Sequence, residues 1–215
     1  MQESPYAGIE RLARNASKCR MCFEDASLGL RAPTIAIAQP RWIGPGYWES
    51  RTRVLIVMIN PGSGDGRQDG ADAEMYRRLI AFRDDPAATL ASVFEHQRRD
   101  MPNWGRRRWL KYYVDGLGLN IQEIAFANIA WCATQGNRYP LKMLSNCFKK
   151  FTAPLIELLS PRSILLSGSS VHGYKSNIQV IAPNARVICL MNHAHREGKI
   201  AEQNELDRVR KMLTA

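Results

Sequence analysis

Apolar residues along the chain follow two kinds of pattern. Four short continuous runs predict buried strands, at residues 54–59, 126–131, 163–167 and 187–191. Elsewhere apolar residues recur three or four positions apart, which predicts helices at residues 4–17, 73–82, 87–97, 104–117, 141–159, 169–179 and 202–213. Strands that alternate with helices favour a parallel sheet with right-handed crossovers. We therefore expect an α/β fold with a single three-layer domain over residues 1–215, in which helices flank a central four-stranded parallel sheet.

Polar residues and glycines gather where the predicted strands end. Ligands of parallel α/β sheets bind outside the carboxyl ends of the strands, so these positions locate the expected site. They are Asn60-Pro61-Gly62, the stretch from Asn128 to Cys132, Gly168, and Asn192-His193. Taken alone, Asn60-Pro61-Gly62 is equally typical of a strand-to-loop turn.

The charge of the chain points to a polyanionic partner. Its 30 Lys and Arg residues outnumber 20 Asp and Glu, which gives a net charge of +10 and a pI near 9.7. Such a balance suits nucleic acid, or an anionic membrane surface. The segment Arg106-Arg-Arg-Trp109 is typical of phosphate contacts, and also of the solvated face of a helix.

The sequence offers no support for a membrane protein. No run approaches the roughly 20 apolar residues that span a bilayer, and the N-terminus lacks the layout of a signal peptide. We expect a soluble monomer in the cytoplasm, associated with the nucleoid if the source is bacterial. In that reducing compartment, five cysteines favour metal ligands or core residues over disulfides.

Four of the cysteines form two pairs, Cys19-x2-Cys22 and Cys132-x14-Cys147. Four thiolates suit tetrahedral zinc or an iron–sulfur cluster. The alternative is that Cys132 and Cys147 are small buried hydrophobic residues and that the first pair is incidental. Cys189 alternates within an apolar run, which predicts a core position.

Two histidines, His193 and His195, follow the last predicted strand. They are compatible with a metal pair, a catalytic acid or base, phosphate contacts, or solvated surface.

In combination, these motifs resemble the iron–sulfur branch of the uracil-DNA glycosylase superfamily. Met58-Ile-Asn-Pro-Gly62 after a strand is similar to the Asn-Pro-Gly form of the family's first motif. The series from Asn128 through Cys132, Gly136-Asn-Arg138 and Pro140 to Cys147 resembles the cluster-bearing members. The resemblance runs from Cys19 to Asn192 and covers most of the chain.

The resemblance implies a role for each matching residue. A 4Fe-4S cluster would be held by four ligands, Cys19, Cys22, Cys132 and Cys147. Asn60 would position the attacking water and His193 would support the departing uracil. Asn128 would read the edge of a flipped uracil, because one amide offers both a donor and an acceptor. The remaining expected substrate contacts are Gly62, Ser63, Tyr76, His195 and Arg196.

Two motifs depart from the family pattern. The family's last motif is typically His-Pro-Ser, whereas this chain has His193-Ala-His195, so His195 and Asn192 stay open as alternatives to His193. The aromatic residue that stacks on uracil is also displaced. Tyr76 is the nearest candidate, and Tyr47 and Trp48 are the alternatives.

The resemblance thus implies a monofunctional glycosylase that flips uracil out of single- or double-stranded DNA and hydrolyses its glycosidic bond in base excision repair. Two other hypotheses remain open. One is a glycosylase for another deaminated base, such as hypoxanthine, xanthine or mismatched thymine. The other is a metal-containing protein that binds nucleic acid without catalysis.

Overall fold

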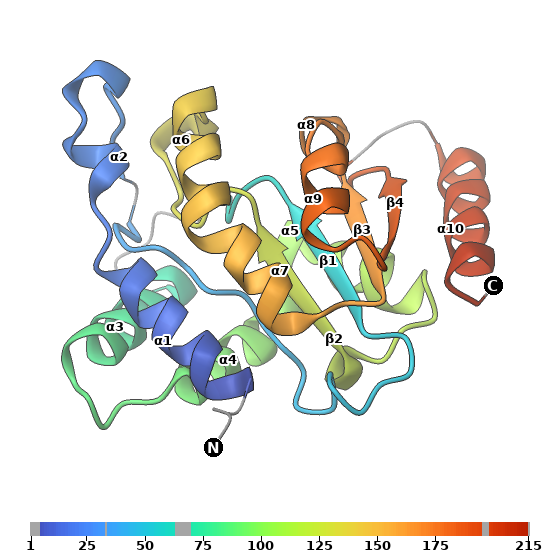
Figure 1. The fold of residues 1–215 in the computed structure, drawn as a ribbon, viewed down its shortest axis with the longest axis horizontal. Helices are drawn as coiled ribbons and strands as arrows, with labels where there is room; N and C mark the ends of the chain where they lie inside the picture. The colour runs from blue at the N-terminus through green and yellow to red at the C-terminus, as the bar shows by residue number, and fades with distance from the viewer. Residues whose placement is uncertain (1–4, 33, 63–69, 195–197, 215) are drawn as a thin grey trace. The chain divides into compact units, whose positions relative to one another are not determined.

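Four five-residue strands form one sheet in the computed structural model, which describes residues 5–32, 34–62, 70–194 and 198–214 (Figure 1). The strands are β1 (Val54–Met58), β2 (Ile124–Asn128), β3 (Ser163–Ser167) and β4 (Arg186–Leu190). Their order is β2-β1-β3-β4, and the sheet is entirely parallel. Leu55 lies opposite Ile164, and Leu165 lies opposite Ile188. The expected α/β class with a four-stranded parallel sheet is confirmed.

The chain divides into two compact units, each built from three stretches of sequence. Unit 1 comprises residues 1–41, 60–97 and 128–159, and unit 2 comprises residues 42–59, 98–127 and 160–215. The sheet belongs to unit 2, except that the last residue of β2, Asn128, groups with unit 1. A single domain over residues 1–215 stays a prediction.

Continuous burial explains the apolar runs of the strands. All five residues of β1, β2 and β3 are buried, as expected for strands that are covered on both faces. The second strand begins and ends earlier than its predicted range of 126–131. It starts at Ile124 because residues 42–44 hydrogen-bond to it there: the Gly44 N–H donates to Ile124 O, and the Phe126 N–H donates to Trp42 O. The strand ends at Asn128.

Unit 2 contains several helices besides the sheet. They are α5 (Trp104–Arg107), a π-helix (Lys111–Asp115), α8 (Ser169–His172), α9 (Lys175–Ile181) and α10 (Lys199–Thr214). Helix α10 packs beside the edge strand β4 (Figure 1). The continuous helix predicted at residues 104–117 is wrong, because Gly105, Arg106 and Arg107 adopt φ values of 55°, 56° and 66°. The predicted helix at 169–179 is likewise divided near Gly173.

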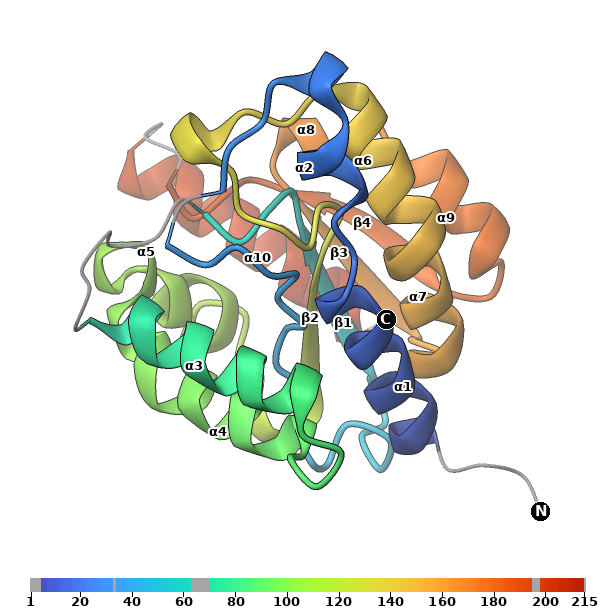
Figure 2. The same cartoon turned by 90° about the vertical axis from the view of Figure 1, so that its left-hand side faces the viewer.

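Unit 1 is mainly helical. Its helices are α1 (Pro5–Ser17), α2 (Met21–Glu24), α3 (Ala71–Asp84), α4 (Leu90–Asp100, whose last three residues fall in unit 2), α6 (Leu141–Cys147), a π-helix (Phe148–Thr152) and α7 (Ala153–Leu159). Helices α1 and α7 lie side by side (Figure 2). Gly8 allows this approach, since a Cβ at that position would lie 2.9 Å from Leu158 Cδ2. The short 3₁₀ turns of unit 1 are Ala26–Leu28 and Gln135–Asn137, and those of unit 2 are Met101–Asn103 and Ile121–Glu123.

Candidate functional site

Asn60 follows β1 and is held by hydrogen bonds in unit 1. Its Nδ2 donates to the hydroxyl of Tyr139 and to Oδ1 of Asn137, the latter at 3.3 Å. The Tyr139 hydroxyl in turn donates to Asn137 Oδ1 at 3.4 Å. These two bonds identify the nitrogen end of the amide, so its carbonyl oxygen is at the other end.

Tyr139, which holds this amide, has a buried charge nearby. Arg41 is only 8% exposed, and burial lowers its pKa to about 10 while Asp72 and Tyr139 favour the charged form. Burial also raises the pKa of the Tyr139 phenol. Tyr139 therefore keeps its proton at neutral pH and can serve as a hydrogen-bond donor as well as an acceptor.

The loop that supplies Asn137 and Tyr139 runs between two of the paired cysteines. Gln135–Asn137 forms one 3₁₀ turn, in which Asn137 has a φ of 52°. Asparagine is among the few residues that tolerate this left-handed conformation. The hydroxyl of Thr134 donates to Arg138 O at 2.7 Å, and the Gln135 N–H donates to Arg31 O at 2.8 Å. Thus both the start and the interior of the loop are tied down.

The four paired cysteines are neighbours within unit 1. Cys22, Cys132 and Cys147 are buried, with exposed fractions of 6%, 7% and 4%, and Cys19 is half-buried. Burial, with Cys19 and Cys22 close by, raises the pKa of Cys132 to about 12. The Cys147 thiol lowers the pKa of Cys22, and the pKa of Cys147 itself is raised by Cys22 and by burial. Residues that lie far apart in the sequence therefore influence one another's protonation.

This donor set fits a thiolate-bound metal group in its chemistry. Four sulfur donors are what tetrahedral zinc and four-iron clusters require, and burial of three thiols gives a site screened from water. Among the residues that the structure describes, no group of three or more His, Cys, Asp or Glu side chains is arranged to hold a metal ion. The expected 4Fe-4S cluster stays a prediction. Cys189 was expected in the core, but it is half-buried.

The other predicted residues of unit 1 are spread over several elements. Asn128 is 1% exposed, so a base could reach its amide only after the surrounding side chains move. The backbone carbonyl of Asn128 accepts a hydrogen bond from Thr152 Oγ1 at 2.7 Å, and Trp131 Nε1 donates to the same Oγ1 at 3.1 Å. Gly62 has a φ of 87°, and a Cβ there would meet no atom within 4 Å. Tyr76 is half-buried on α3.

Three predicted substrate contacts, Ser63, His195 and Arg196, lie outside the described residues. The alternative stacking residues belong to unit 2, where Tyr47 is 0% exposed and Trp48 is half-buried. Tyr47 is therefore part of the core.

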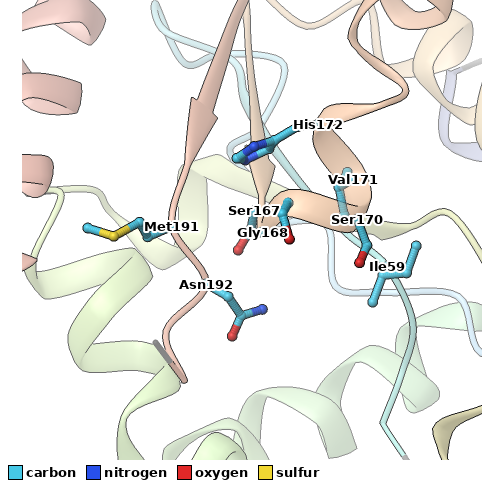
Figure 3. A pocket seen from close by; sticks show the side chains of 9 residues that line it. Ile59, Ser167, Gly168, Ser170, Val171, His172, Met191 and Asn192 are labelled. Atoms are coloured by element: carbon cyan, nitrogen blue, oxygen red, sulfur yellow. The ribbon is translucent and has the colours of Figure 1, made fainter. Parts of the chain in front are cut away.

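Unit 2 contains a cavity of ≈ 310 Å³ at the carboxyl ends of β1, β3 and β4 (Figure 3). The chain leaves β1 toward β2 and leaves β3 toward β4, on the opposite side. This reversal between adjacent strands is where parallel α/β sheets usually bind ligands. The lining combines apolar and polar side chains: Ile59, Ser167, Gly168, Ser169, Ser170, Val171, His172, Met191 and Asn192. Asn192, which was an alternative to His193, thus lines this cavity.

His193 follows β4 and is held by a buried tyrosine of unit 2. The Tyr113 hydroxyl lies 3.3 Å from His193 Nδ1 and accepts the backbone N–H of His193 at 3.3 Å. Burial, followed by the nearby Arg108 charge, lowers the pKa of His193 to about 4. The imidazole is therefore neutral at pH 7, and only one of its two nitrogens carries a proton.

Tyr113 is part of an aromatic cluster that consists of Trp104, Trp109, Tyr112, Tyr113 and Phe126. Trp109 is at its centre, with ring centroids 4.3 Å from Phe126, 5.1 Å from Trp104 and 5.4 Å from Tyr113. The Trp109 indole also donates to Met58 Sδ at 3.4 Å, which connects the cluster to the end of β1. Gly105 adjoins the cluster, and a Cβ there would lie 2.4 Å from His193 Nε2. A side chain at this position would require His193 or the backbone to shift, and the φ of 55° also favours glycine.

The functional residues that sequence reasoning missed are mostly partners of the predicted ones. They are Tyr139, Asn137 and Arg41 in unit 1, and Tyr113, Ser167 and Gly105 in unit 2. Asn137 belongs to the Gly-Asn-Arg motif, so a signal existed for it. Nothing in the local pattern distinguishes Tyr113 from any other aromatic residue on a buried helical face.

A scan against models of protein families found no match, and a search of curated proteins found none either. In the part of the chain that the structure describes, no helix has the length and apolar character needed to cross a membrane.

Proposed function

We propose that the protein is a monofunctional DNA glycosylase that hydrolyses the bond between uracil and deoxyribose, within a uracil-DNA glycosylase-like three-layer fold. The proposal rests on the ordered motifs of the sequence together with the hydrogen bonds that hold each of two polar groups, Asn60 in unit 1 and His193 in unit 2. The net charge of +10 supports a nucleic-acid substrate.

The observation that carries the proposal is that the segment between Cys132 and Cys147 holds Asn60 by hydrogen bonds. Tyr139 and Asn137, from the loop between these cysteines, both accept hydrogen bonds from the Asn60 amide nitrogen. A loop anchored by thiolates would thus fix a neutral amide at the end of β1. This is the arrangement expected if a structural cofactor orients a water-binding group.

Cys19, Cys22, Cys132 and Cys147 would hold the 4Fe-4S cluster. When bound, such a cluster would join the N-terminal segment to the loop after Cys132 and so stiffen the support of Asn60. The protein's own residues would carry out the reaction.

The chemistry suits neutral groups. Glycosidic cleavage develops positive charge on the sugar and negative charge on the departing base, so stabilisation of charge matters more than a strong nucleophile. The carbonyl of Asn60 would orient water toward the sugar. His193, neutral at pH 7, would donate a hydrogen bond to a uracil oxygen as the base leaves, and Asn128 would select the base once the base has left the stack.

The direct test measures release of uracil. Purified protein is incubated with single- and double-stranded oligonucleotides that contain one uracil, and abasic sites are then cleaved with alkali. We expect cleavage at the uracil position, and its absence from both substrates would refute the proposal. A parallel panel with hypoxanthine, xanthine and mismatched thymine identifies the preferred base.

A further inference from the structure

A chain of hydroxyl groups leads from the end of β3 to the imidazole of His193. Ser167, the last residue of β3, is 1% exposed and hydrogen-bonds through Oγ to the Tyr113 hydroxyl. That hydroxyl also lies 3.3 Å from His193 Nδ1. Tyr113 is 0% exposed. We call Ser167, Tyr113 and His193 the hydroxyl chain.

We propose that Tyr113 is a positioning residue: its hydroxyl donates to His193 Nδ1 and thereby keeps the single proton of the imidazole on Nε2. This inference rests on the proposed function, because a donor at Nε2 is what stabilisation of a departing uracil requires. It adds a residue and a direction of hydrogen bonding that the motifs do not contain.

The direction of these hydrogen bonds follows from the donors and acceptors in the hydroxyl chain. The Tyr113 oxygen accepts the His193 backbone N–H, and its own proton can go either to Ser167 Oγ or to His193 Nδ1. If the proton went to Ser167, then the Ser167 hydroxyl would need another acceptor. Ser167 lines the cavity of unit 2 but is only 1% exposed, and among the described residues the hydrogen-bond partner of its hydroxyl is Tyr113 alone. A buried donor without an acceptor is costly, so Ser167 donates to Tyr113 and Tyr113 donates to Nδ1.

The surroundings of His193 support the same assignment. Burial keeps the imidazole neutral, so the position of one proton decides whether Nε2 is a donor or an acceptor. Gly105 lies against the Nε2 side of the ring, since a Cβ on Gly105 would be only 2.4 Å from Nε2. The ring is also packed edge-on to Tyr113, with centroids 5.5 Å apart. Both its orientation and its tautomer are thus determined by unit 2 alone.

The test reads the tautomer directly, by ¹⁵N NMR of the imidazole nitrogens at pH 7 in the ligand-free protein. His193→Gln assigns the His193 signals among those of the four histidines. We expect an unprotonated Nδ1 and a protonated Nε2 in the wild type. A protonated Nδ1 in the wild type would overturn the proposal.

Substitutions then distinguish a role of Tyr113 in positioning the imidazole proton from a role in packing. Tyr113→Phe removes the donor to Nδ1, so we expect His193 to shift toward the Nδ1–H tautomer and kcat for uracil release to fall about tenfold or more with KM little changed. Ser167→Ala should keep the Nε2–H tautomer, since Nδ1 remains an acceptor for the Tyr113 proton. Unchanged His193 signals in Tyr113→Phe would contradict the inference.

Tyr112→Phe is the matched control. It also removes a buried tyrosine hydroxyl, which donates to Met191 O at 3.0 Å, but this hydroxyl makes no hydrogen bond to the described atoms of His193. The His193 signals of this variant should match those of the wild type. A shifted tautomer in Tyr112→Phe would mean that the proton moves because the aromatic cluster loosens, and not because the Tyr113 hydroxyl is lost. Since the spectra need no substrate, a wild-type Nε2–H tautomer without base release would refute the proposed function alone.

Discussion

Two polar side chains of proposed catalytic importance, Asn60 in unit 1 and His193 in unit 2, are each held by a tyrosine hydroxyl, but the two tyrosines are supported differently. Tyr139 belongs to a half-exposed loop between Cys132 and Cys147. Tyr113 is fully buried in the aromatic cluster. The orientation of Asn60 should therefore depend on what the cysteines bind, whereas that of His193 should depend on core packing. Identical hydrogen-bonding groups can thus respond to quite different perturbations.

The largest effect is expected when the polar groups themselves are removed. Asn60→Ala and His193→Ala should each lower kcat for uracil release by about 10² to 10³, because each group acts on charge that develops in the transition state. Single-turnover alkali-cleavage assays measure the rates. Asn177→Ala, an exposed asparagine on α9, is the control and should retain wild-type activity. Wild-type rates in either active-site variant would remove that residue from the mechanism.

Loss of a cysteine ligand should affect the support of Asn60 and leave the support of His193 unchanged. We expect Cys132→Ser to abolish bound iron, measured by metal analysis and by absorbance near 400 nm (roughly where iron–sulfur clusters absorb). Activity should fall with it, while the ¹⁵N signals of His193 stay unchanged. Cys189→Ser provides the control, because Cys189 is not among the four neighbouring thiols, and it should keep its iron. Equal iron in the two variants, or no iron in the wild type, would contradict a cluster at these residues.

A smaller loss is expected from Tyr139→Phe. Asn60 Nδ2 would lose one acceptor but keep Asn137 Oδ1, so we expect kcat to fall about tenfold without loss of iron. The matched change is Tyr113→Phe, which alters the His193 signals where Tyr139→Phe does not. If Tyr139→Phe retains full activity, Asn137 alone is sufficient to orient the amide.

The smallest effect concerns pH. The pKa of His193 is about 4 in the folded protein, against 6.5 for a histidine of the unfolded chain. Between these values the unfolded chain binds more protons, so the stability contributed by the neutral imidazole is complete above pH 6.5 and is lost as pH falls toward 4. Arg108 and Tyr113 are the ionisable neighbours involved. Urea unfolding should show that the free energy of unfolding falls more in the wild type than in His193→Gln between about pH 7 and about pH 4.5. Equal decreases in the two proteins would mean that the imidazole is exposed to water.

The sequence predicted most of the sheet because continuous burial leaves a continuous apolar run, as in residues 163–167. It misplaced the second strand, whose start is set by hydrogen bonds to residues 42–44 rather than by its own composition. The helical spacing of residues 104–117 was real, since Trp109 and Tyr113 share a buried face. The left-handed turn at Gly105 interrupts the predicted helix close to its start, at the point where the backbone lies against His193. Local pattern contains no information on such a distant contact.

The amide, imidazole and thiol groups of the candidate site were predictable from the sequence, whereas the residues that hold them in place were not. Cys19 and Cys22 were expected to join Cys132 and Cys147, and the four are neighbours. Tyr139 and Tyr113 were not foreseen, because the value of a phenol hydroxyl depends on which atom folding brings within hydrogen-bond distance of it. Partners of this kind become visible only in three dimensions.

The division of the chain also bears on the order of events during synthesis. The chain passes from one unit to the other several times, and unit 1 ends at Leu159 whereas unit 2 extends to the C-terminus. A nascent chain leaves the ribosome from its N-terminus, and compact regions can form before translation ends. All four paired cysteines are therefore synthesised before β3 and β4. A cofactor that binds them would need no residue of these two strands, so unit 1 could receive it while the rest of the sheet is still being made.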